Sequence, residues 1–197
     1  MNNLVCYQVT IQSFSTGRQT ALLAPAKEED MPTDWEFSWC ELWQNTDFDC
    51  QAIVKLVYSG QVCGLVRFGL YPYLEPPEFV EPQFLEIEQL EAHPESRGTS
   101  ANRLLEPIGK WLVWYATRFS LQRCSGGAGD SPVFLVALEE AVDYYRDIIQ
   151  MQYLGPSMIA PGEDGYGFKF SRAGAEAFCR KQESKWGVPT PFRPESS

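Results

Sequence analysis

The chain has 197 residues, 44% of them hydrophobic and 21% charged, and its formal net charge is −10 at pH 7. The length fits one domain with a full hydrophobic core, and the composition is that of a globular protein. Because nucleic-acid binding requires a basic surface, so acidic a chain excludes nucleic acid as a partner. No apolar run approaches the roughly 18 residues of a membrane span, and the N-terminus lacks the features of a signal peptide. We therefore expect a cytoplasmic protein without a membrane partner.

Residues that bind metals or serve in catalytic triads are sparse. His93 is the only histidine, and the six cysteines include no Cys-x-x-Cys pair. Tetrahedral metal sites are built from clustered cysteines and histidines, so no metal centre is expected. A triad based on serine or cysteine would have to use His93. Since His93 precedes Pro94 at the end of a predicted strand, we assign it a structural role.

The N-terminal region contains a predicted strand and a predicted helix. Residues 5–11 alternate loosely between apolar and polar side chains, which is typical of a strand. Residues 35–43 place three tryptophans and Leu42 on one face of a helix. Asp34 precedes this segment and is available as its N-cap.

A hairpin, a loop and a strand follow in order. Residues 52–58 and 61–70 are rich in β-forming side chains and flank a Ser-Gly turn, which predicts a hairpin. Four prolines fall in residues 71–83 and predict an extended loop. Residues 84–92 then predict a strand that carries several glutamates.

The longest helix signal comes next. Apolar residues recur at spacings of four, four, three and four, which keeps them on one helical face. Pro107 lies inside this stripe and predicts a kink near residues 103–107, because proline removes a backbone hydrogen bond. The stripe is formed by Leu104, Ile108, Leu112, Tyr115 and Phe119.

The C-terminal region alternates strands and helices. Residues 133–138 form a fully apolar run that predicts a short buried strand, and residues 141–149 have helical spacing. Residues 153–159 and 166–170 flank a Pro-Gly turn and predict a second hairpin, and residues 172–183 predict a final helix.

These elements together predict an α+β fold with a three-layer or half-barrel arrangement, since antiparallel pairs surround a central β-α-β unit. We expect a single domain over residues 1–186, followed by a flexible Pro/Ser-rich tail over residues 187–197.

The turn between the strand 84–92 and the long helix is rich in glycine, serine and threonine. A helix N-terminus presents unpaired N–H groups and the positive end of the helix dipole, so it binds phosphate well. Arg97 and Arg103 flank this turn. A bound anion would explain two cations at the end of a helix that disfavours them, and two solvated surface arginines are the alternative.

This part of the chain resembles the GNAT superfamily of N-acetyltransferases. In that family a strand ends near Val-x-Pro, and a motif Q/R-x-x-G-x-G/A then opens a helix with paired leucines. An apolar strand and an Ala-x-x-Φ-Tyr segment follow downstream. The matching stretches here are Ala92–Pro94, Arg97–Asn102, Leu104–Leu105, Val133–Ala137 and Ala141–Tyr145.

The resemblance covers about residues 84–170 and implies a GNAT-like fold. That fold has a mixed, mostly antiparallel central sheet with splayed middle strands and flanking helices. It further implies acetyl-CoA as the co-substrate, no metal, and acyl transfer to a primary amine on a small molecule or a peptide. A homodimer is left open.

The resemblance also implies roles for individual residues. The strand backbone at Leu90, Glu91 and Ala92 would pair with the pantetheine arm of acetyl-CoA. Tyr145 would protonate the departing thiolate, since a phenol can donate to a thiolate. The loop whose N–H groups would hold the pyrophosphate consists of Arg97, Gly98, Thr99, Ser100, Ala101 and Asn102.

A general base must take a proton from the ammonium form of the acceptor. Glu86 and Glu88 alternate with Leu85 and Ile87, so both carboxylates project from one face of the strand. If that face lines the cleft, either carboxylate can act directly or through a water. A solvent-facing pair is the alternative.

The pyrophosphate motif is degenerate in this chain. Ser100 and Asn102 occupy the two positions where the family has small residues, mostly glycine. Glycine lets the backbone approach the pyrophosphate closely, and Asn102 adds a side chain there. A GNAT-shaped binding or interaction module without catalysis is therefore the alternative function.

Overall fold

The computed structural model describes residues 4–71, 83–97, 103–124, 131–160 and 162–192. Its strands are β1 (Cys6–Ser13), β2 (Gly17–Pro25), β3 (Gln51–Tyr58), β4 (Gln61–Tyr71), β5 (Phe84–Ala92), β6 (Leu105–Glu106), β7 (Val133–Ala137), β8 (Gln152–Ala160), β9 (Glu163–Phe170) and β10 (Thr190–Phe192). They form one sheet in the order β10-β1-β2-β3-β4-β5-β7-β9-β8, with β6 paired to β1.

The helices are fewer than the strands. They are α1 (Trp39–Gln44), α2 (Ile108–Arg123) and α3 (Arg172–Trp186), together with short 3-10 turns and a π-helix over Tyr144–Ile149. This combination confirms the predicted α+β class with flanking helices. No helix in the described ranges combines the length and apolar character that crossing a membrane requires.

The chain forms two compact units. Unit 1 comprises residues 1–67, 89–115 and 182–197, and unit 2 comprises residues 68–88 and 116–181. β4, β5, α2 and α3 each contribute residues to both units.

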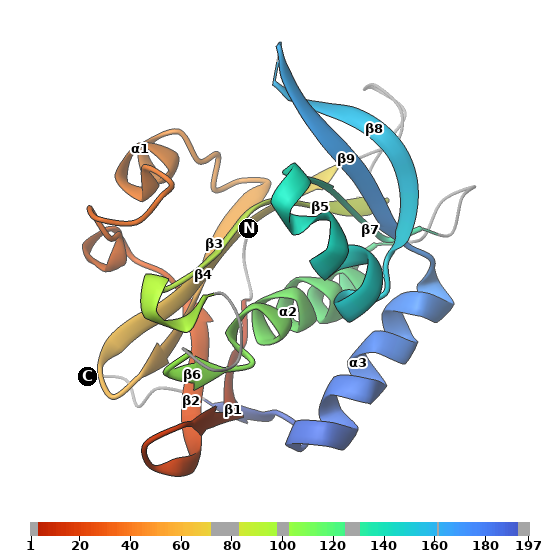
Figure 1. Cartoon of the computed structure of the whole chain (residues 1–197). Coiled ribbons are helices and arrows are strands. Elements are labelled where there is room, and N and C mark those ends of the chain that lie inside the picture. Colours follow the sequence, from red (N-terminus) through yellow and green to blue (C-terminus); the bar gives the residue numbers. More distant parts are fainter. Residues whose placement is uncertain (1–3, 72–82, 98–102, 125–130, 161, 193–197) are drawn as a thin grey trace. The chain divides into compact units, whose positions relative to one another are not determined.

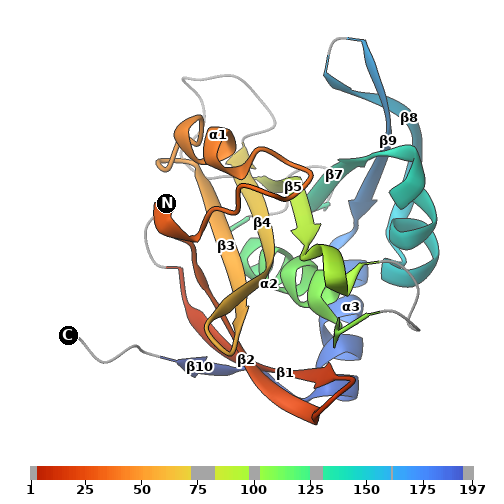
Figure 2. The same cartoon turned by 60° about the vertical axis from the view of Figure 1, so that its left-hand side comes forward.

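Unit 1 is built around antiparallel strands. β1 pairs with β2 and β2 pairs with β3, and Figures 1 and 2 both show these three strands side by side. Met31, Trp39, Ile53 and Leu65 form a buried cluster that joins α1 to β3 and β4. Trp111 of α2 is fully buried, and its indole N–H donates a hydrogen bond to the backbone oxygen of Thr10 at 2.8 Å, which attaches the helix to β1.

Unit 2 is built around β7, β8 and β9. β7 and β8 both pair antiparallel with β9, and the β8–β9 hairpin is the long two-stranded element drawn in blue in Figure 1. Leu85, Leu135 and Phe168 are buried on one face of these strands. Since side chains alternate along a strand, the intervening residues of β5 and β7 lie on the opposite face.

The parallel pair β5–β7 is short. Leu85–Ile87 pair with Val133–Leu135. Among the described residues no further pairing joins these strands, although β5 continues to Ala92 and β7 continues to Ala137. The predicted mostly antiparallel sheet with splayed middle strands is thus confirmed.

Several predicted elements are confirmed with nearly the expected bounds. The strand 84–92 is β5, the hairpins are β3–β4 and β8–β9, and the final helix is α3. In the first hairpin Ser59 and Gly60 have φ values of 51° and 79°, as a two-residue turn between twisted strands requires. The helix expected at 141–149 is present as a 3-10 turn followed by the π-helix.

The helix expected at 35–43 is shorter than predicted. α1 begins at Trp39, with Ser38 and not Asp34 at the N-cap position. The backbone N–H groups of Glu36 and Phe37 donate to the carboxylate of Glu91, at 2.8 Å and 3.3 Å. Glu91 lies 54 or 55 residues away in the sequence, and its hydrogen bonds hold the 36–37 segment outside a helix. The spacing of residues 35–43 gives no sign of this distant partner.

The long helix also begins later than predicted, so the expected kink at Pro107 is wrong. α2 starts at Ile108, and Pro107 stands immediately before it. Leu105 and Glu106 instead form β6, which pairs with Ser13 and Gln12 of β1. The residue before a proline favours extended backbone, and a proline at a helix start loses no intrahelical hydrogen bond, so the boundary is physically expected.

Besides β6, two strands had no counterpart in the predictions. β2 occupies a stretch to which no element was assigned, and β10 lies within the segment expected to be a tail, where it pairs with Cys6–Gln8 of β1. The loop expected at 71–83 falls almost entirely outside the described residues.

Candidate functional site

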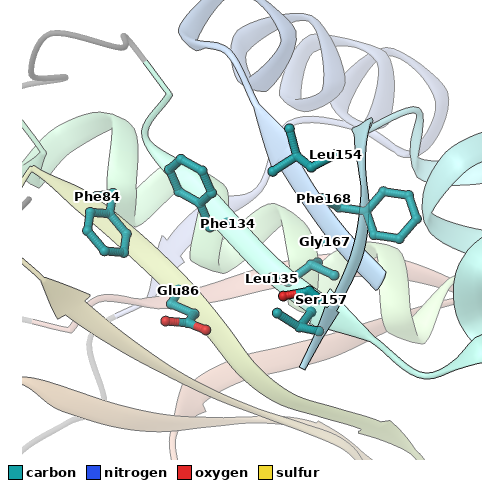
Figure 3. Close-up of a pocket in the computed structure, with 9 residues that line it drawn as sticks. Phe84, Glu86, Phe134, Leu135, Leu154, Ser157, Gly167 and Phe168 are labelled. Carbon is teal, nitrogen blue, oxygen red and sulfur yellow. The ribbon is translucent and has the colours of Figure 1, made fainter. Parts of the chain in front are cut away.

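A pocket of about 390 Å³ opens on unit 2, lined by residues of β5, β7, β8 and β9. Along β5, Phe84 and Glu86 face this pocket, while Leu85 and Ile87 face the core. β7, β8 and β9 complete the walls (Figure 3). The lining residues are Phe84, Glu86, Phe134, Leu135, Val136, Leu154, Ser157, Gly167 and Phe168.

Aromatic side chains form one wall of the pocket. The rings of Phe84 and Phe134 lie 5.3 Å apart in an edge-to-face arrangement, and Tyr71 lies 5.9 Å from Phe84. Figure 3 shows Phe84 and Glu86 on β5 and Phe134 on the neighbouring strand β7. An apolar wall beside a carboxylate suits a ligand with a cationic end and a hydrocarbon body.

The Glu86 carboxyl group has a perturbed acidity. Burial among the apolar side chains raises its pKa above the ordinary value, and the negative charge of Glu88 raises this pKa further. A carboxylate with a raised pKa is a stronger base, which is the direction required to take a proton from an ammonium group.

Glu88 is held by a partner of its own. Its carboxylate accepts a short hydrogen bond from the hydroxyl group of Tyr71. The two predicted bases therefore differ: Glu86 lines the pocket, whereas Glu88 faces Tyr71 and is not among the lining residues. The projection of both from one strand face is confirmed by the burial of Leu85 and Ile87 behind them.

Tyr145 lies in the π-helix of unit 2. Its ring is buried and packs against the rings of Tyr144 and Phe168, at 5.3 Å and 5.8 Å. Burial raises the pKa of its phenol, so the hydroxyl group stays protonated at neutral pH. π-helical turns are frequent at functional sites. The role of Tyr145 as a proton donor stays a prediction.

The strand end implied to bind pantetheine lies in unit 1. Leu90, Glu91 and Ala92 are the last three residues of β5. The Glu91 side chain is buried, and it accepts hydrogen bonds from the backbone of the 36–37 segment and from the indole N–H of Trp39, the last at 2.6 Å. Glu91 thus fixes the segment before α1 to the end of β5.

Arg97 forms ion pairs and a hydrogen bond within the protein. Its guanidinium group pairs with the carboxylates of Glu91 and Glu36, the second at 2.7 Å, and its Nε donates to the backbone oxygen of Ala92 at 2.7 Å. The two carboxylates supply the negative charge that was expected from a bound anion. Gly98, Thr99, Ser100, Ala101 and Asn102 lie outside the described residues.

The late start of α2 changes the geometry expected for the phosphate loop. Residues 97–102 were expected to open the long helix, but β6 and Pro107 separate them from Ile108. In the described part of this region the loop does not run directly into the first turn of α2, so the helix dipole begins several residues beyond it.

His93 borders a second, smaller pocket of about 200 Å³ in unit 1. Its Nδ1 accepts a hydrogen bond from the backbone N–H of Glu95, and its ring packs edge-to-face on Trp35 at 5.7 Å. These contacts agree with a structural role for His93. In the part of the chain that the structure describes, no cluster of three or more His, Cys, Asp or Glu side chains is placed to hold a metal.

Glu86 was predicted from the sequence, but most of the pocket around it was not. Phe84 and Phe134 carried a signal, because each occupies the exposed phase of a strand whose alternate residues are buried. Ser157 and Gly167 gave no comparable signal, since only the pairing of β8 with β9 brings them to this face.

The fold is that of the GNAT acetyltransferases. The aminoglycoside acetyltransferase AAC(6')-Ib, solved with coenzyme A and kanamycin, is similar with a TM-score of 0.54 at 10% identity, over 80% of this chain and 98% of that one. An uncharacterized protein from Bacillus halodurans is similar with a TM-score of 0.61 at 10% identity, over 93% and 99% of the two chains.

A toxin also shares the fold. AtaT, solved with the C-terminus of the antitoxin AtaR, is similar with a TM-score of 0.51 at 14% identity, over 79% of this chain and 94% of that one. No family model and no curated protein sequence matches the chain. At such low identity the likeness defines the fold and leaves the activity to be argued from the residues.

Proposed function

We propose that this protein transfers an acetyl or other short acyl group from a CoA thioester to a primary amine. The observation that carries the proposal is Glu86, a base with a raised pKa that lines an apolar pocket on a GNAT fold. The amine acceptor binds beside Glu86, and acetyl-CoA binds through the backbone of Leu90–Ala92 and residues 97–102.

The chemistry assigns one proton step to each of two residues. Glu86 takes a proton from the substrate ammonium, directly or through a water, and the neutral amine attacks the thioester carbon. The carbon–nitrogen bond forms, the carbon–sulfur bond breaks, and Tyr145 gives its proton to the departing thiolate. The proton that nitrogen loses as the amide forms restores the tyrosine. Glu88 acts on Glu86 through its charge.

The cofactor contacts follow from the backbone. The amide and carbonyl groups of Leu90, Glu91 and Ala92 pair with the pantetheine arm, and a backbone N–H at this strand end polarises the thioester carbonyl. The N–H groups of Arg97, Gly98, Thr99, Ser100, Ala101 and Asn102 hold the pyrophosphate.

A second candidate function is a GNAT-shaped binding module without catalysis. The engagement of Arg97 by Glu91 and Glu36 favours it, because a guanidinium group neutralised by two carboxylates offers less charge to a phosphate. Ser100 and Asn102, in place of small residues of the family motif, point the same way.

Calorimetric titration with acetyl-CoA and with CoA distinguishes acyl transfer from the non-catalytic binding module. The acetyltransferase proposal expects micromolar binding of both, together with release of free CoA thiol when amines are added. Asn102→Gly is expected to tighten binding, because it removes a side chain next to the pyrophosphate. An absence of binding up to millimolar concentrations, in the wild type and in Asn102→Gly alike, would establish the non-catalytic module.

A further inference from the structure

The pocket of unit 2 has the chemistry to choose among amines. Its volume of about 390 Å³ lies in the range of about 300–1,000 Å³ typical of small-molecule sites. Of its lining residues in the described chain, Glu86 and Ser157 alone have polar side chains. The remaining lining is aromatic, aliphatic or glycine.

The polar groups of the pocket suit one ammonium group. A cation at Glu86 relieves the cost of holding a carboxylate among apolar side chains, and the Ser157 hydroxyl can accept a further N–H hydrogen bond. Glu88 does not supply a second site, because Tyr71 already donates to its carboxylate away from the lining.

The apolar walls suit a hydrocarbon body and disfavour further polar groups. Phe84, Phe134 and Leu154 would contact the part of the ligand beyond its nitrogen. A hydroxyl or ammonium group buried against these side chains would lose its water without finding a partner, at a cost of about 1–3 kcal/mol for a neutral group and more for a charge. Each additional polar group adds a similar cost, so a ligand with many of them binds more weakly.

Gly167 shapes the pocket on the β9 side. A methyl group added there would meet the Cβ atom of Leu154 at 3.5 Å, an ordinary contact, so the strand tolerates a small side chain. A longer side chain at this position would occupy the pocket itself.

We propose that the acceptor is a monoamine whose single ammonium group pairs with Glu86 and whose aryl or alkyl body contacts the Phe84–Phe134 wall. Polycationic acceptors, such as the aminoglycoside bound by the structurally similar AAC(6')-Ib, are excluded by the same chemistry. The assignment of this ligand as an acyl acceptor rests on the proposed function, whereas its binding does not.

Three probes test the proposal on the full chain by calorimetry without CoA: 2-phenylethylamine, ethylamine and kanamycin. 2-Phenylethylamine is expected to bind at least 10-fold more tightly than either of the others, since it alone has both an ammonium group and an apolar body of this size. Equal or tighter binding of kanamycin, or no binding of 2-phenylethylamine up to 10 mM, would overturn the proposal.

Two variants test whether 2-phenylethylamine binds in this pocket. Glu86→Gln is expected to weaken 2-phenylethylamine at least 10-fold, whereas the matched change Glu163→Gln, at an exposed position of β9 outside the lining, leaves it unchanged. Gly167→Leu is expected to weaken it by a similar factor, and circular dichroism reports whether this variant folds. Binding that survives Glu86→Gln would overturn the assignment even if Gly167→Leu does not fold.

Turnover separates this inference from the proposed function. If 2-phenylethylamine binds as expected but acetyl-CoA neither binds nor reacts, the proposed function fails and the ligand class stands. If acetyl-CoA reacts with kanamycin and not with 2-phenylethylamine, the proposed function stands and the ligand class fails.

Discussion

At the scale of single residues, Glu86 is expected to determine the pH dependence of acyl transfer. The carboxylate form is the base, and burial together with Glu88 raises its pKa. The acid limb of kcat/KM should therefore have its midpoint above the ordinary glutamate range of about 4.3. Glu86→Gln is expected to lower kcat/KM by about 10²–10⁴-fold, as loss of a general base does. A pH–rate profile with 2-phenylethylamine measures both effects.

Glu88→Gln is the matched control for this limb. Removing the like charge lowers the pKa of Glu86, so the acid limb should move to lower pH while turnover at neutral pH is largely kept. An unchanged limb in Glu88→Gln, or a profile in Glu86→Gln identical to that of the wild type, would assign the base to another group.

The same carboxyl group predicts a dependence of stability on pH. A glutamate whose pKa is raised in the folded state binds its proton more tightly there than in the unfolded chain, so its contribution favours folding at low pH and is lost as pH rises through the folded pKa. Glu86→Gln should therefore be more stable than the wild type at about pH 7, and the difference should disappear near pH 4. Urea unfolding at both pH values provides the measurement.

Glu91 is the residue on which the strand end depends. Its buried carboxylate accepts hydrogen bonds from Glu36, Phe37 and Trp39 and pairs with Arg97. Glu91→Ala should lower the free energy of unfolding by about 3–5 kcal/mol, because it removes the buried partner of Arg97 and the acceptor of the Glu36, Phe37 and Trp39 N–H groups. Urea denaturation measures the loss.

Glu36→Gln is the comparison for Glu91→Ala. Its carboxylate also pairs with Arg97, but the Glu36 side chain is 63% exposed. Exposed ion pairs contribute about 0–1 kcal/mol, so this variant should stay within that range. A similar loss in both variants would mean that the Arg97 charge, and not the buried network, is what stabilises the strand end.

At the scale of elements, the contact between β4 and α2 in unit 1 depends on Gly64. A Cβ atom at this position would lie 2.5 Å from Cγ2 of Ile108 and 2.9 Å from Cδ1 of Leu112. Gly64→Ala should therefore destabilise the fold by about 1–3 kcal/mol through overpacking. The melting temperature and the urea midpoint both report this.

Gly167→Ala adds the same methyl group to another strand and serves as the control. There the new Cβ would have no neighbour closer than 3.5 Å, and φ is not in the left-handed region, so stability should change little. If the two substitutions cost the same, loss of chain flexibility in the unfolded state and not close packing would be the cause.

The element boundaries show which local signals were reliable. β5 was predicted with its observed bounds because Leu85 and Ile87 alternate with Glu86 and Glu88, and this period of two depends on neighbouring residues alone. The helical stripe was in phase from Leu104 onward, yet Leu104 is 52% exposed and lies outside α2. Spacing alone did not place the boundary that Pro107 enforces.

At the scale of the whole molecule, the sheet ends in β10, which pairs with β1. Removal of residues 188–197 would expose the backbone N–H and C=O groups of Cys6–Gln8 as a new sheet edge. We expect a melting temperature lower by several degrees, at about 2–4 °C per kcal/mol lost, and an increased tendency to associate. Thermal unfolding and size-exclusion chromatography measure the two effects.

Removal of residues 193–197 alone is the control for this truncation, because it keeps Thr190–Phe192. The shorter truncation should behave like the full chain. If the two truncations have the same melting temperature, β10 does not stabilise the sheet and the whole segment after residue 187 behaves as a tail. Chromatography of the full chain also shows whether it is the homodimer that the sequence left open.

One part of the candidate site was predictable from the sequence, and the other part depended on strand pairing. Glu86 was predicted as a base from its phase in a strand, because a carboxylate that alternates with the apolar residues Leu85 and Ile87 faces away from the core. Its apolar surroundings were not predicted, since Phe134, Leu154 and Gly167 come from strands that meet β5 only through pairing. The acidity of Glu86 follows from those surroundings and so was equally beyond the sequence.

The sequence by itself determined the α+β class and the two hairpins, because these rest on periodicity and turn chemistry over a few neighbouring residues. The splayed GNAT arrangement was implied by the resemblance of its motifs to that family. Tertiary structure decided where α1 begins, what neutralises Arg97 and what surrounds Glu86. Each of these depends on groups far apart in the chain, such as Glu36 and Arg97, which are 61 residues apart. No local pattern records such a pairing, because only the folded sheet brings the partners together.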